Sequence, residues 1–352
     1  MELGVQLHLP TYSNSSLAGL LELARDATSV GVRQIWVTDN LQSRNLFVVL
    51  AALAIELDVK LGAATMVQYF RSPVEAADAI ATISDLMQGR ELSIAIARGN
   101  PYTDRLIEVR KPVTFLQESA RCIKQLLEGG RVDAAGYPTL ASYFNFAPNA
   151  AFQLGFKPTG PIRLYGAGNG PRALAIAGKD MDGVIFDGRV WALAAIGRLD
   201  ELLAIAGRGV ITREAGHHRR IGQVKISVAR DADAARDFAR SSAAIRSLGL
   251  RRRGYPDSDL QRLGIDPRDV DKVERETAEG ASADELQPYG TDAMVDAMYV
   301  AGDPERCRAR LKEIGAVAAT HGFDQLMLSE LGPDPSEALR LIATEVLPAL
   351  NV

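Results

Sequence analysis

The sequence contains very little cysteine. Cys122 and Cys307 are the only two among 352 residues, and each stands in a stretch with helical periodicity. Two such isolated thiols give neither a disulfide framework nor a thiolate metal site, which excludes disulfide-stapled domains and zinc modules. The chain is therefore expected to work in a reducing cytoplasm.

Residues that carry catalysis without a cofactor are equally sparse. The chain has four histidines, of which His217 and His218 stand in a polar loop, and it contains neither an HExxH zinc motif nor a GxSxG nucleophile elbow. No metal site is expected. An enzyme built from this sequence would need an organic cofactor to supply its chemistry.

Two further absences concern partners. Lysine and arginine number 40 against 44 aspartates and glutamates, a net charge of −4 without a long basic stripe, so neither nucleic acid nor an anionic membrane is an expected partner. No apolar stretch approaches the roughly 18 residues of a membrane span, and the first residues lack the basic and apolar regions of a signal peptide. A soluble, unexported protein with a small-molecule substrate is expected.

What the sequence does contain is a regular alternation of short apolar runs and amphipathic stretches. Strands are predicted at 3–9, 34–39, 59–67, 91–97, 162–168, 182–187, 222–230 and 323–330, with helices between them. Because parallel neighbours need helical crossovers, the whole chain, 1–352, is predicted to form one (β/α)8 TIM barrel of the α/β class. An open doubly wound sheet is the alternative.

Two segments interrupt this rhythm and are interpreted as insertions in the barrel. Residues 131–161 are rich in glycine, proline and aromatics, which predicts a loop or small hairpin over one barrel end. Residues 249–289 are polar with weak periodicity, which predicts a helical excursion. Residues that set substrate choice are expected in these two segments.

The loops that follow the strands build the active site of such a barrel. The residues at these positions are His8, Thr38, Asp39, Asn40, Ala64, Thr65, Met66, Arg98, Asn100, Gly166, Gly168, Asn169, Gly170, Asp187, Ser329 and Glu330. Arg98 and Asn100 are too polar for a barrel interior and suit its open mouth.

The turn after the fifth strand, in "YGAGNGPRALAIAG", is the sharpest of these signals. A glycine-rich turn into a helix that starts near Pro171 exposes backbone N–H groups beside the positive helix terminus, and this arrangement binds phosphate groups. Glycines that serve only a tight turn are the alternative. No acidic residue follows at the spacing of a dinucleotide fingerprint.

Four stretches, in order along nearly the whole chain, carry a family resemblance. They are "IWVTDN", "GAATMVQYFRSPVEAADAIATISDLMQGRELSIAIARGN", "LYGAGNGPRALAIAGKDMDGVIFDG" and "VAGDPERCRARLKEIGAVAATHGFDQLML". Together they resemble the bacterial luciferase-like flavin-dependent oxidoreductases, particularly the methylenetetrahydromethanopterin reductase-like branch. The resemblance implies a luciferase-like barrel that holds FMN or the deazaflavin coenzyme F420 at its C-terminal mouth.

The resemblance implies a catalytic set at the first strand ends. Asp39 matches a position near the reactive ring, and Asn40 stands where histidine is frequent in the family, so a histidine general acid is absent there. His8, after the first strand, completes the predicted catalytic residues. Ala64 and Thr65 match a bulge where the family often carries a cis non-proline peptide behind the ring.

The remaining matches imply a cofactor site. Arg98 matches an arginine that reaches the phosphate in FMN-using relatives, whereas a glucose-6-phosphate-oxidising deazaflavin branch carries an acid there, so that activity is disfavoured. Gly168, Asn169 and Gly170 match the loop that binds the cofactor phosphate. The predicted cofactor-binding residues are Ala64, Thr65, Arg98, Asn100, Gly166, Gly168, Asn169 and Gly170.

The favoured function is an F420-dependent oxidoreductase that transfers hydride between the cofactor and a small organic substrate. The first alternative is an FMN-dependent monooxygenase that uses reduced flavin, supplied by a separate flavin reductase, and oxygen. The second is a flavin-binding barrel without turnover. The resemblance also implies a homodimer, and the predicted helices at 46–57 and 73–87 are unusually apolar, which suits an interface. Packing of these helices within the barrel is the alternative.

Overall fold

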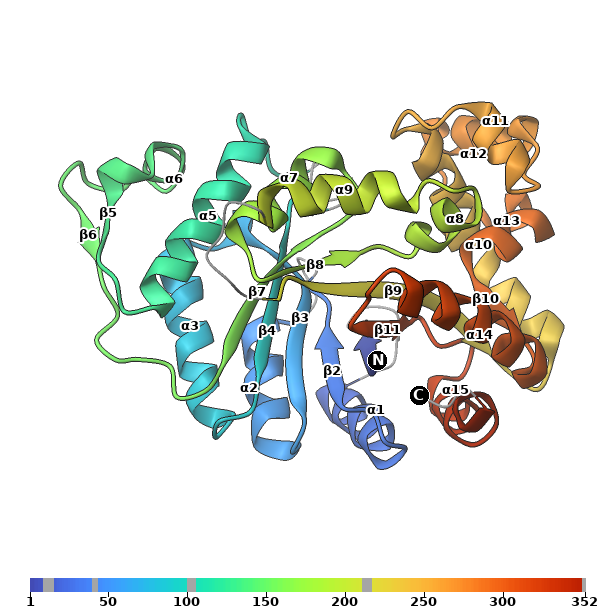
Figure 1. The fold of residues 1–352 in the computed structure, drawn as a ribbon, viewed down its shortest axis with the longest axis horizontal. Coiled ribbons are helices and arrows are strands. Elements are labelled where there is room, and N and C mark those ends of the chain that lie inside the picture. The colour runs from blue at the N-terminus through green and yellow to red at the C-terminus, as the bar shows by residue number, and fades with distance from the viewer. Residues whose placement is uncertain (9–15, 40–43, 100–105, 211–216, 350–352) are drawn as a thin grey trace.

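The computed structural model describes residues 1–8, 16–39, 44–99, 106–210 and 217–349, in which eight parallel strands close into a barrel (Figure 1). In chain order the barrel strands are β1 (Glu2–Leu7), β2 (Gln34–Val37), β3 (Lys60–Val67), β4 (Leu92–Ala97), β7 (Ile162–Ala167), β8 (Gly183–Phe186), β9 (Arg219–Val228) and β11 (Gln325–Ser329). Strand β1 pairs with both β2 and β11, and β8 pairs with β9, so the ring is closed. The barrel prediction is confirmed and the open sheet is excluded.

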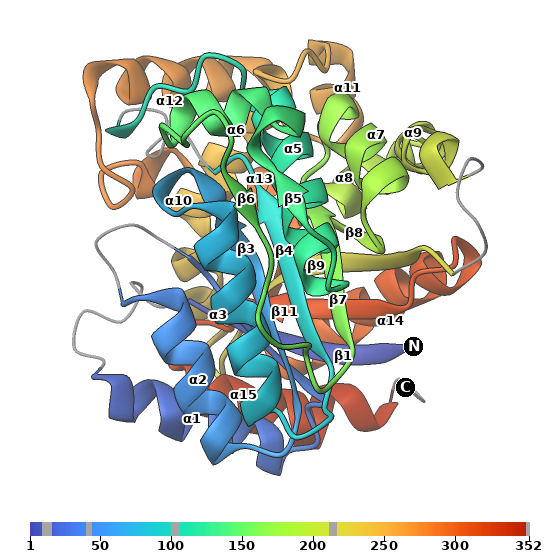
Figure 2. The same cartoon turned by 90° about the vertical axis from the view of Figure 1, so that its left-hand side faces the viewer.

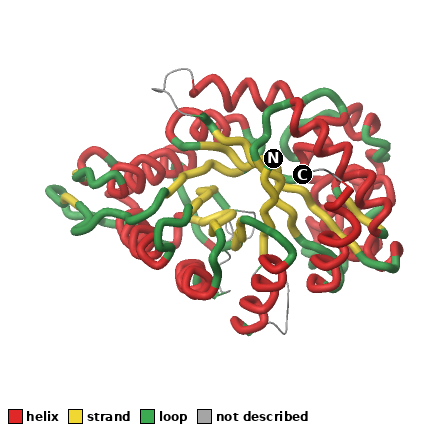
Figure 3. The backbone as a smooth tube through the Cα atoms, turned by 60° about the horizontal axis from the view of Figure 1, so that its bottom comes forward, coloured by secondary structure: helices red, strands yellow, loops and turns green. Residues whose placement is uncertain are grey.

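Helices surround the central strands on all sides (Figure 3). The helices of the ring and of its excursions are α1 (Leu17–Ser29), α2 (Leu46–Glu56), α3 (Pro73–Leu86), α5 (Pro112–Leu127), α6 (Pro138–Tyr143), α7 (Pro171–Asp180), α8 (Arg189–Ala195), α9 (Leu199–Val210), α10 (Ala232–Arg251), α11 (Asp257–Arg262), α12 (Pro267–Glu279), α13 (Asp292–Met298), α14 (Pro304–Thr320) and α15 (Pro335–Leu341). Side-chain oxygens of Ser16, Asn45 and Ser72 cap the first three, because helix starts leave N–H groups without partners.

Three elements differ from the sequence prediction. The sequence between the predicted strands at 182–187 and 222–230 predicts one helix, over 191–206, but the structure has two, α8 and α9, because Gly197 between them adopts a left-handed φ of 74°. A short strand, β10 (Val300–Gly302), which the periodicity did not indicate, pairs with the end of β9. The last helix does not run evenly to Leu347, since α15 passes into a π-helical turn at Ile342–Val346.

The segment 131–161 forms the small hairpin that its sequence suggested, β5 (Val132–Asp133) against β6 (Ala151–Phe152), with α6 at its tip. Figure 2 shows this hairpin on the outer side of α5, where Glu118 accepts hydrogen bonds from backbone N–H groups at the start of α6. It reaches the barrel rim where the Tyr143 hydroxyl donates to the Tyr69 carbonyl at 3.3 Å. The hairpin therefore braces the rim after β3 rather than covering the mouth.

The segment 249–289 is helical, as predicted, and contains the end of α10, all of α11 and α12, and a short 3-10 turn at Gln287–Tyr289. In Figure 1 these orange helices gather beyond α8 on the β9 and β10 side of the barrel. Helix α10 follows β9 directly, so this excursion is anchored at a strand end that borders the mouth.

Large side chains fill the middle of the barrel, and glycines in β1 and β3 leave the space that they need. Trp36 is fully buried and meets Tyr165 edge to face, with ring centroids 6.0 Å apart. A Cβ atom at Gly4 would lie 2.9 Å from the Trp36 Nε1, and one at Gly62 would lie 2.4 Å from its ring. The two glycines are therefore required by the packing of this indole.

Candidate active site

The floor of the C-terminal mouth is built from small residues above the packed interior. Ala64, Ala95, Trp36 and Tyr165 belong to one buried cluster inside the barrel, and Ala167 packs against it. Ala64 and Thr65 are joined by a cis peptide bond, the feature implied by the family resemblance. The register of β3 against β4 shifts at the same place, which is the predicted bulge.

Two buried glutamines fix this peptide from below. Gln223 donates to the Gln6 side-chain oxygen at 2.6 Å, and Gln6 in turn donates to the Ala64 carbonyl. The side-chain oxygen of Gln223 accepts from the Gly188 N–H at 3.3 Å, which connects this series of hydrogen bonds to the end of β8. The oxygen and nitrogen of each side-chain amide thus have partners, and the hydrogen bonds link β8, β9, β1 and β3.

Asp39, expected near the reactive ring, is held in a buried ion pair. Its carboxylate accepts from both Nη atoms of Arg71 and, at 3.0 Å, from the Val67 N–H, while the Asp39 and Arg71 side chains are 5% and 14% exposed. The Arg71 guanidinium also lies over the Phe47 ring, 5.1 Å from its centroid. The structure thus gives Asp39 the role of locking β2 to the turn after β3. The neighbouring Asn40 lies outside the described residues.

A charged cluster stands at the ends of β9 and β11. The Glu330 carboxylate accepts from Lys225 Nζ at 2.5 Å and from the Tyr299 hydroxyl, and lies 3.6 Å from Arg246 Nη2. Burial alone would raise the pKa of Glu330, but Lys225 and Arg246 outweigh it and hold the pKa far below its usual value. Burial, followed by Arg246, lowers the pKa of Lys225 to about 8.

The backbone that carries Glu330 is strained. Glu330 and Leu331 are not glycines, yet they adopt φ angles of 77° and 58°. The turn is held by Gly332, whose N–H donates to the Glu330 carbonyl at 2.7 Å, and by the Leu331 carbonyl, which accepts from the Val228 N–H at 3.0 Å. Strain of this kind at a charged strand end is typical of functional sites.

His8 lies beside this cluster, after β1. Its Nε2 atom is buried, and no residue in the described ranges makes a hydrogen bond to it. Burial, followed by the positive charge of Lys225, lowers the pKa of His8 to about 3, so the imidazole is neutral at pH 7. A buried ring nitrogen without a partner is a group that a ligand can satisfy.

The glycine turn after β7 is open where a ligand would approach. Gly168 has a left-handed φ of 120°, and a Cβ atom added at Gly168 or Gly170 would meet nothing within 4 Å. Gly170 precedes Pro171 at the start of α7. Within the described residues, the N–H groups of Asn169 and Gly170 have no acceptor, whereas that of Gly168 donates to Ile185 at 2.9 Å.

Asn169 and Gly166 have roles in the fold that sequence reasoning did not foresee. The Asn169 side chain, 3% exposed, accepts from the Asp187 N–H at 3.0 Å and donates back to Asp187, so it joins the ends of β7 and β8. A Cβ atom at Gly166 would lie 2.5 Å from Ala177 of α7. The missing side chain at Gly166 is thus explained by helix packing rather than by a ligand.

Arg98 follows β4 at the mouth, and its side chain is exposed. Asn100, predicted beside it, lies outside the described residues. Sequence reasoning missed Arg71, Lys225, Arg246 and Tyr299. Of these, only Lys225 gave a signal, because it is a charged residue inside the buried run "GQVKISV".

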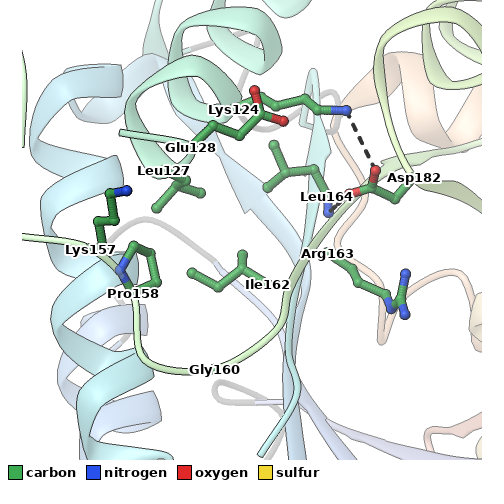
Figure 4. A pocket seen from close by; sticks show the side chains of 10 residues that line it. All are labelled: Lys124, Leu127, Glu128, Lys157, Pro158, Gly160, Ile162, Arg163, Leu164 and Asp182. Atoms are coloured by element: carbon green, nitrogen blue, oxygen red, sulfur yellow. Dashed lines mark hydrogen bonds and ion pairs between the residues drawn. The ribbon is translucent and has the colours of Figure 1, made fainter. Parts of the chain in front are cut away.

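A pocket elsewhere on the molecule does not belong to this site. It opens between α5 and the start of β7, and Figure 4 shows Lys124 paired with Asp182 across it, with Lys157 and Pro158 on the opposite wall. Its residues stand at the amino-terminal ends of β7 and β8. Active sites of (β/α)8 barrels are built at the other end.

The described residues contain neither a candidate metal cluster nor a helix suited to cross a membrane. No group of three or more metal-binding side chains comes together in these ranges. The helices within them lack the length and apolar character needed to cross a bilayer.

The closed (β/α)8 barrel, the cis peptide in its floor and the open glycine turn before a helix are the structural features that the family resemblance implied. The chain belongs to the luciferase-like monooxygenase family, whose model matches residues 2–321. Membership confirms the family resemblance and the enzyme class seen in the sequence.

Relatives of the chain match it along its length. It is 29% identical over 360 residues to a 5,10-methylenetetrahydromethanopterin reductase of Archaeoglobus fulgidus, with all of both chains covered. A coenzyme F420-dependent tetrahydromethanopterin reductase from Methanopyrus kandleri superposes with a TM-score of 0.75 at 21% identity, over 99% of both chains. The FMN complex of a Baeyer–Villiger monooxygenase from Pseudomonas putida does so with a TM-score of 0.68 at 18% identity, over 99% and 98%.

Proposed function

We propose that the protein is an F420-dependent oxidoreductase that transfers hydride between the deazaflavin and a small organic substrate. The observation that carries this proposal is the similarity, along the entire chain, to methylenetetrahydromethanopterin reductases. A structure of one such reductase, from Methanopyrus kandleri, is described as F420-dependent. The family alone leaves FMN as the other candidate cofactor.

The described residues fit a flavin-type cofactor. The glycine turn suits a phosphate, because Gly168 and Gly170 leave space for a ligand and stand at the positive end of a ten-residue helix. The N–H groups of Asn169 and Gly170, which have no acceptor among the described residues, would bind it. Ala64 and Thr65 would lie beneath the ring of such a cofactor, and Gln6 holds the Ala64 carbonyl in place by a hydrogen bond. When bound, the deazaflavin supplies the hydride chemistry.

The chain's own groups would handle the proton that accompanies hydride transfer. Lys225, with a pKa near 8, is charged at neutral pH yet close enough to neutrality to give up a proton. Glu330 accepts from the Lys225 ammonium through one carboxylate oxygen and from the Tyr299 hydroxyl through the other, so the carboxylate that holds Lys225 is itself fixed. His8, which is neutral and whose Nε2 no described residue bonds, would hydrogen-bond the substrate or the ring.

Retention of cofactor tests the proposal. The purified protein is mixed separately with F420 and with FMN and passed through an ultrafiltration membrane, and the absorbance of the retained fraction is recorded. We expect the protein to retain F420. The absorbance of the retained deazaflavin should then fall when a small organic substrate transfers hydride to it. Retention of FMN alone would contradict the proposal.

A second function is compatible with Arg98, whose stretch resembles both FMN-using and reductase-like members of the family and so suits either cofactor. Arg98 follows β4 with an exposed side chain, at the position of the arginine that reaches the phosphate in FMN-using relatives. In this case the protein would be an FMN-dependent monooxygenase supplied with reduced flavin by a separate reductase. Oxygen consumption with reduced FMN and a flavin reductase, above that of the reductase alone, identifies this function. A barrel that retains either cofactor but turns over neither would be a binding protein.

A further inference from the structure

Cationic side chains accumulate where α8 and α10 meet the barrel mouth. Asp187, after β8, accepts from Arg189 Nε at 2.9 Å and lies 3.9 Å from Arg253 Nη2. Arg246 lies 3.6 Å from Glu330, which Lys225 already neutralises. Within the described ranges, Asp187 and Glu330 are the carboxylates paired with these four cations, so the cluster carries an excess of positive charge.

The geometry forces two of these guanidinium groups together. A Cβ atom at Gly249 of α10 would lie 2.4 Å from Arg189 Nη1 and 3.3 Å from Arg253 Nη1. Burial, followed by the like charges of Arg189 and Arg246, lowers the pKa of Arg253 against the opposing effect of Asp187. Asp187 is the one carboxylate paired with both of these guanidinium groups among the described residues, so a second anion would offset the remaining repulsion between them.

An apolar strip runs beside the cluster. Phe238, Ser242, Ile245 and Gly249 follow one another at helical spacing on α10, so they share one stripe of that helix. Ser242 accepts from Arg246 at 3.3 Å and Gly249 borders Arg189, which places this stripe at the cluster. Phe238 and Ile245 are nevertheless 37% and 43% exposed.

We propose that Arg189, Arg246 and Arg253 form a subsite for an anionic group of the substrate, a phosphate or carboxylate, with Phe238 and Ile245 contacting the adjoining apolar part. The subsite deepens the proposed function, because it names the class of substrate that the barrel would take. Arg189 binds Asp187 from the α8 side, whereas Asn169 of the glycine turn binds it from the α7 side. Asp187 thus stands between the arginine cluster and the glycine turn, so the anion would bind beside the place proposed for the cofactor phosphate.

Sulfate is a suitable probe, because its charge is constant near neutral pH. Calorimetric titration of the cofactor-free full chain with sodium sulfate should show binding that Arg253→Gln weakens about tenfold, the usual effect of losing one charge-assisted hydrogen bond. Arg252→Gln is the matched control, since it removes the same charge from the adjacent residue, which is 48% exposed and faces Glu274. Equal affinities of the two variants, or no sulfate binding by the wild type, would overturn the proposal.

A second variant keeps every charge. Gly249→Ala places a methyl group where Arg189 Nη1 now lies, so Arg189 must swing away and sulfate affinity should fall severalfold. Gly207→Ala in α9 is the control, because a Cβ atom there meets nothing within 4 Å. An unchanged affinity in Gly249→Ala would contradict the convergence of the two arginines on one anion.

The sulfate titration is repeated with the retained cofactor already bound. It distinguishes a subsite for an anionic group of the substrate from one for an anionic part of the cofactor. Arg253-dependent sulfate binding that persists assigns the subsite to the substrate. Binding that the cofactor abolishes would assign the subsite to an anionic part of the cofactor and overturn the proposal. Failure of both cofactors to bind would refute the proposed function but leave the sulfate result intact.

Discussion

At the residue scale, two arginines near the mouth differ in how far their side chains are exposed. Arg71 is 14% exposed, binds Asp39 through both Nη atoms and covers the Phe47 ring. Arg98 follows β4 with an exposed side chain. Burial therefore predicts that Arg71 contributes to stability and that Arg98 is placed to contact a ligand.

Arg71→Ala should lower the free energy of unfolding by about 3 to 5 kcal/mol, because it leaves the Asp39 carboxylate buried without its counter-charge. Urea unfolding followed by circular dichroism measures this change. A loss below about 1 kcal/mol would show that water replaces the guanidinium and that the pair is not structural.

Arg98→Ala should weaken cofactor binding by roughly ten- to a hundredfold, the usual cost of losing a charge-assisted hydrogen bond. Its effect on the melting temperature of cofactor-free protein should be small, because exposed substitutions seldom change stability by more than about 0.5 kcal/mol. Fluorescence titration and a thermal melt give the two numbers. A large fall in melting temperature with unaltered affinity would assign Arg98 a structural role.

Gly168→Asp should weaken cofactor binding at least tenfold, because it sets a carboxylate beside the N–H groups proposed to hold a phosphate. Gly168→Asn is the matched control, since it carries the same size and the same left-handed backbone without the charge. Titration of both variants isolates the electrostatic part. Equal cofactor affinities of the two variants would contradict the proposal that this turn binds a phosphate.

The lowered pKa of Glu330 predicts how the stability of the protein depends on pH. This pKa is lowered from an ordinary value of 4.5, so the folded state gains stability above pH 4.5 and loses it as the pH falls through the folded pKa. Glu330→Gln should therefore be less stable than the wild type near pH 7, with the difference shrinking below pH 4.5. Urea titrations at several pH values test this, and a difference that grew in acid would contradict it.

At the scale of elements, α2 has a composition that its surroundings do not explain. Every residue of Leu46–Glu56 except the last is apolar, and an all-apolar helix is normally buried on all sides. Val48 and Ile55 are nevertheless 61% and 71% exposed, one above the other at a spacing of seven residues. We propose that a second copy of the chain covers this face.

Ile55→Glu should then shift the protein from dimer to monomer at micromolar concentration, because it would bury a charge in the interface. Light scattering coupled to size exclusion measures the mass. Phe156→Glu is the control, since Phe156 is also exposed, at 38%, but lies in the hairpin segment. A monomeric wild type would remove the proposed dimer.

At the scale of the whole molecule, the barrel could be predicted because each of its eight strands shows an apolar pattern within a few residues of sequence. The strand ends at His8, Asp39 and Arg98 were located by the same local pattern. The pairings were not, since Asp39 meets Arg71 and Lys225 meets Glu330 only when the ring closes and sets β9 beside β11. The strand β10 escaped because three residues are too few to show a period.

Trp36 in the barrel centre makes the residues allowed at positions 4 and 62 depend on the residue at position 36. A side chain at Gly62 would enter the indole ring, and one at Gly4 would displace its nitrogen, which donates to Gln325 at 2.9 Å. Neither glycine can be replaced while the tryptophan remains, and a smaller residue at 36 would leave a void below the floor. Among descendants of a common ancestor, we expect positions 4, 36 and 62 to change in concert, so that a lineage that enlarges either glycine has already given up the tryptophan.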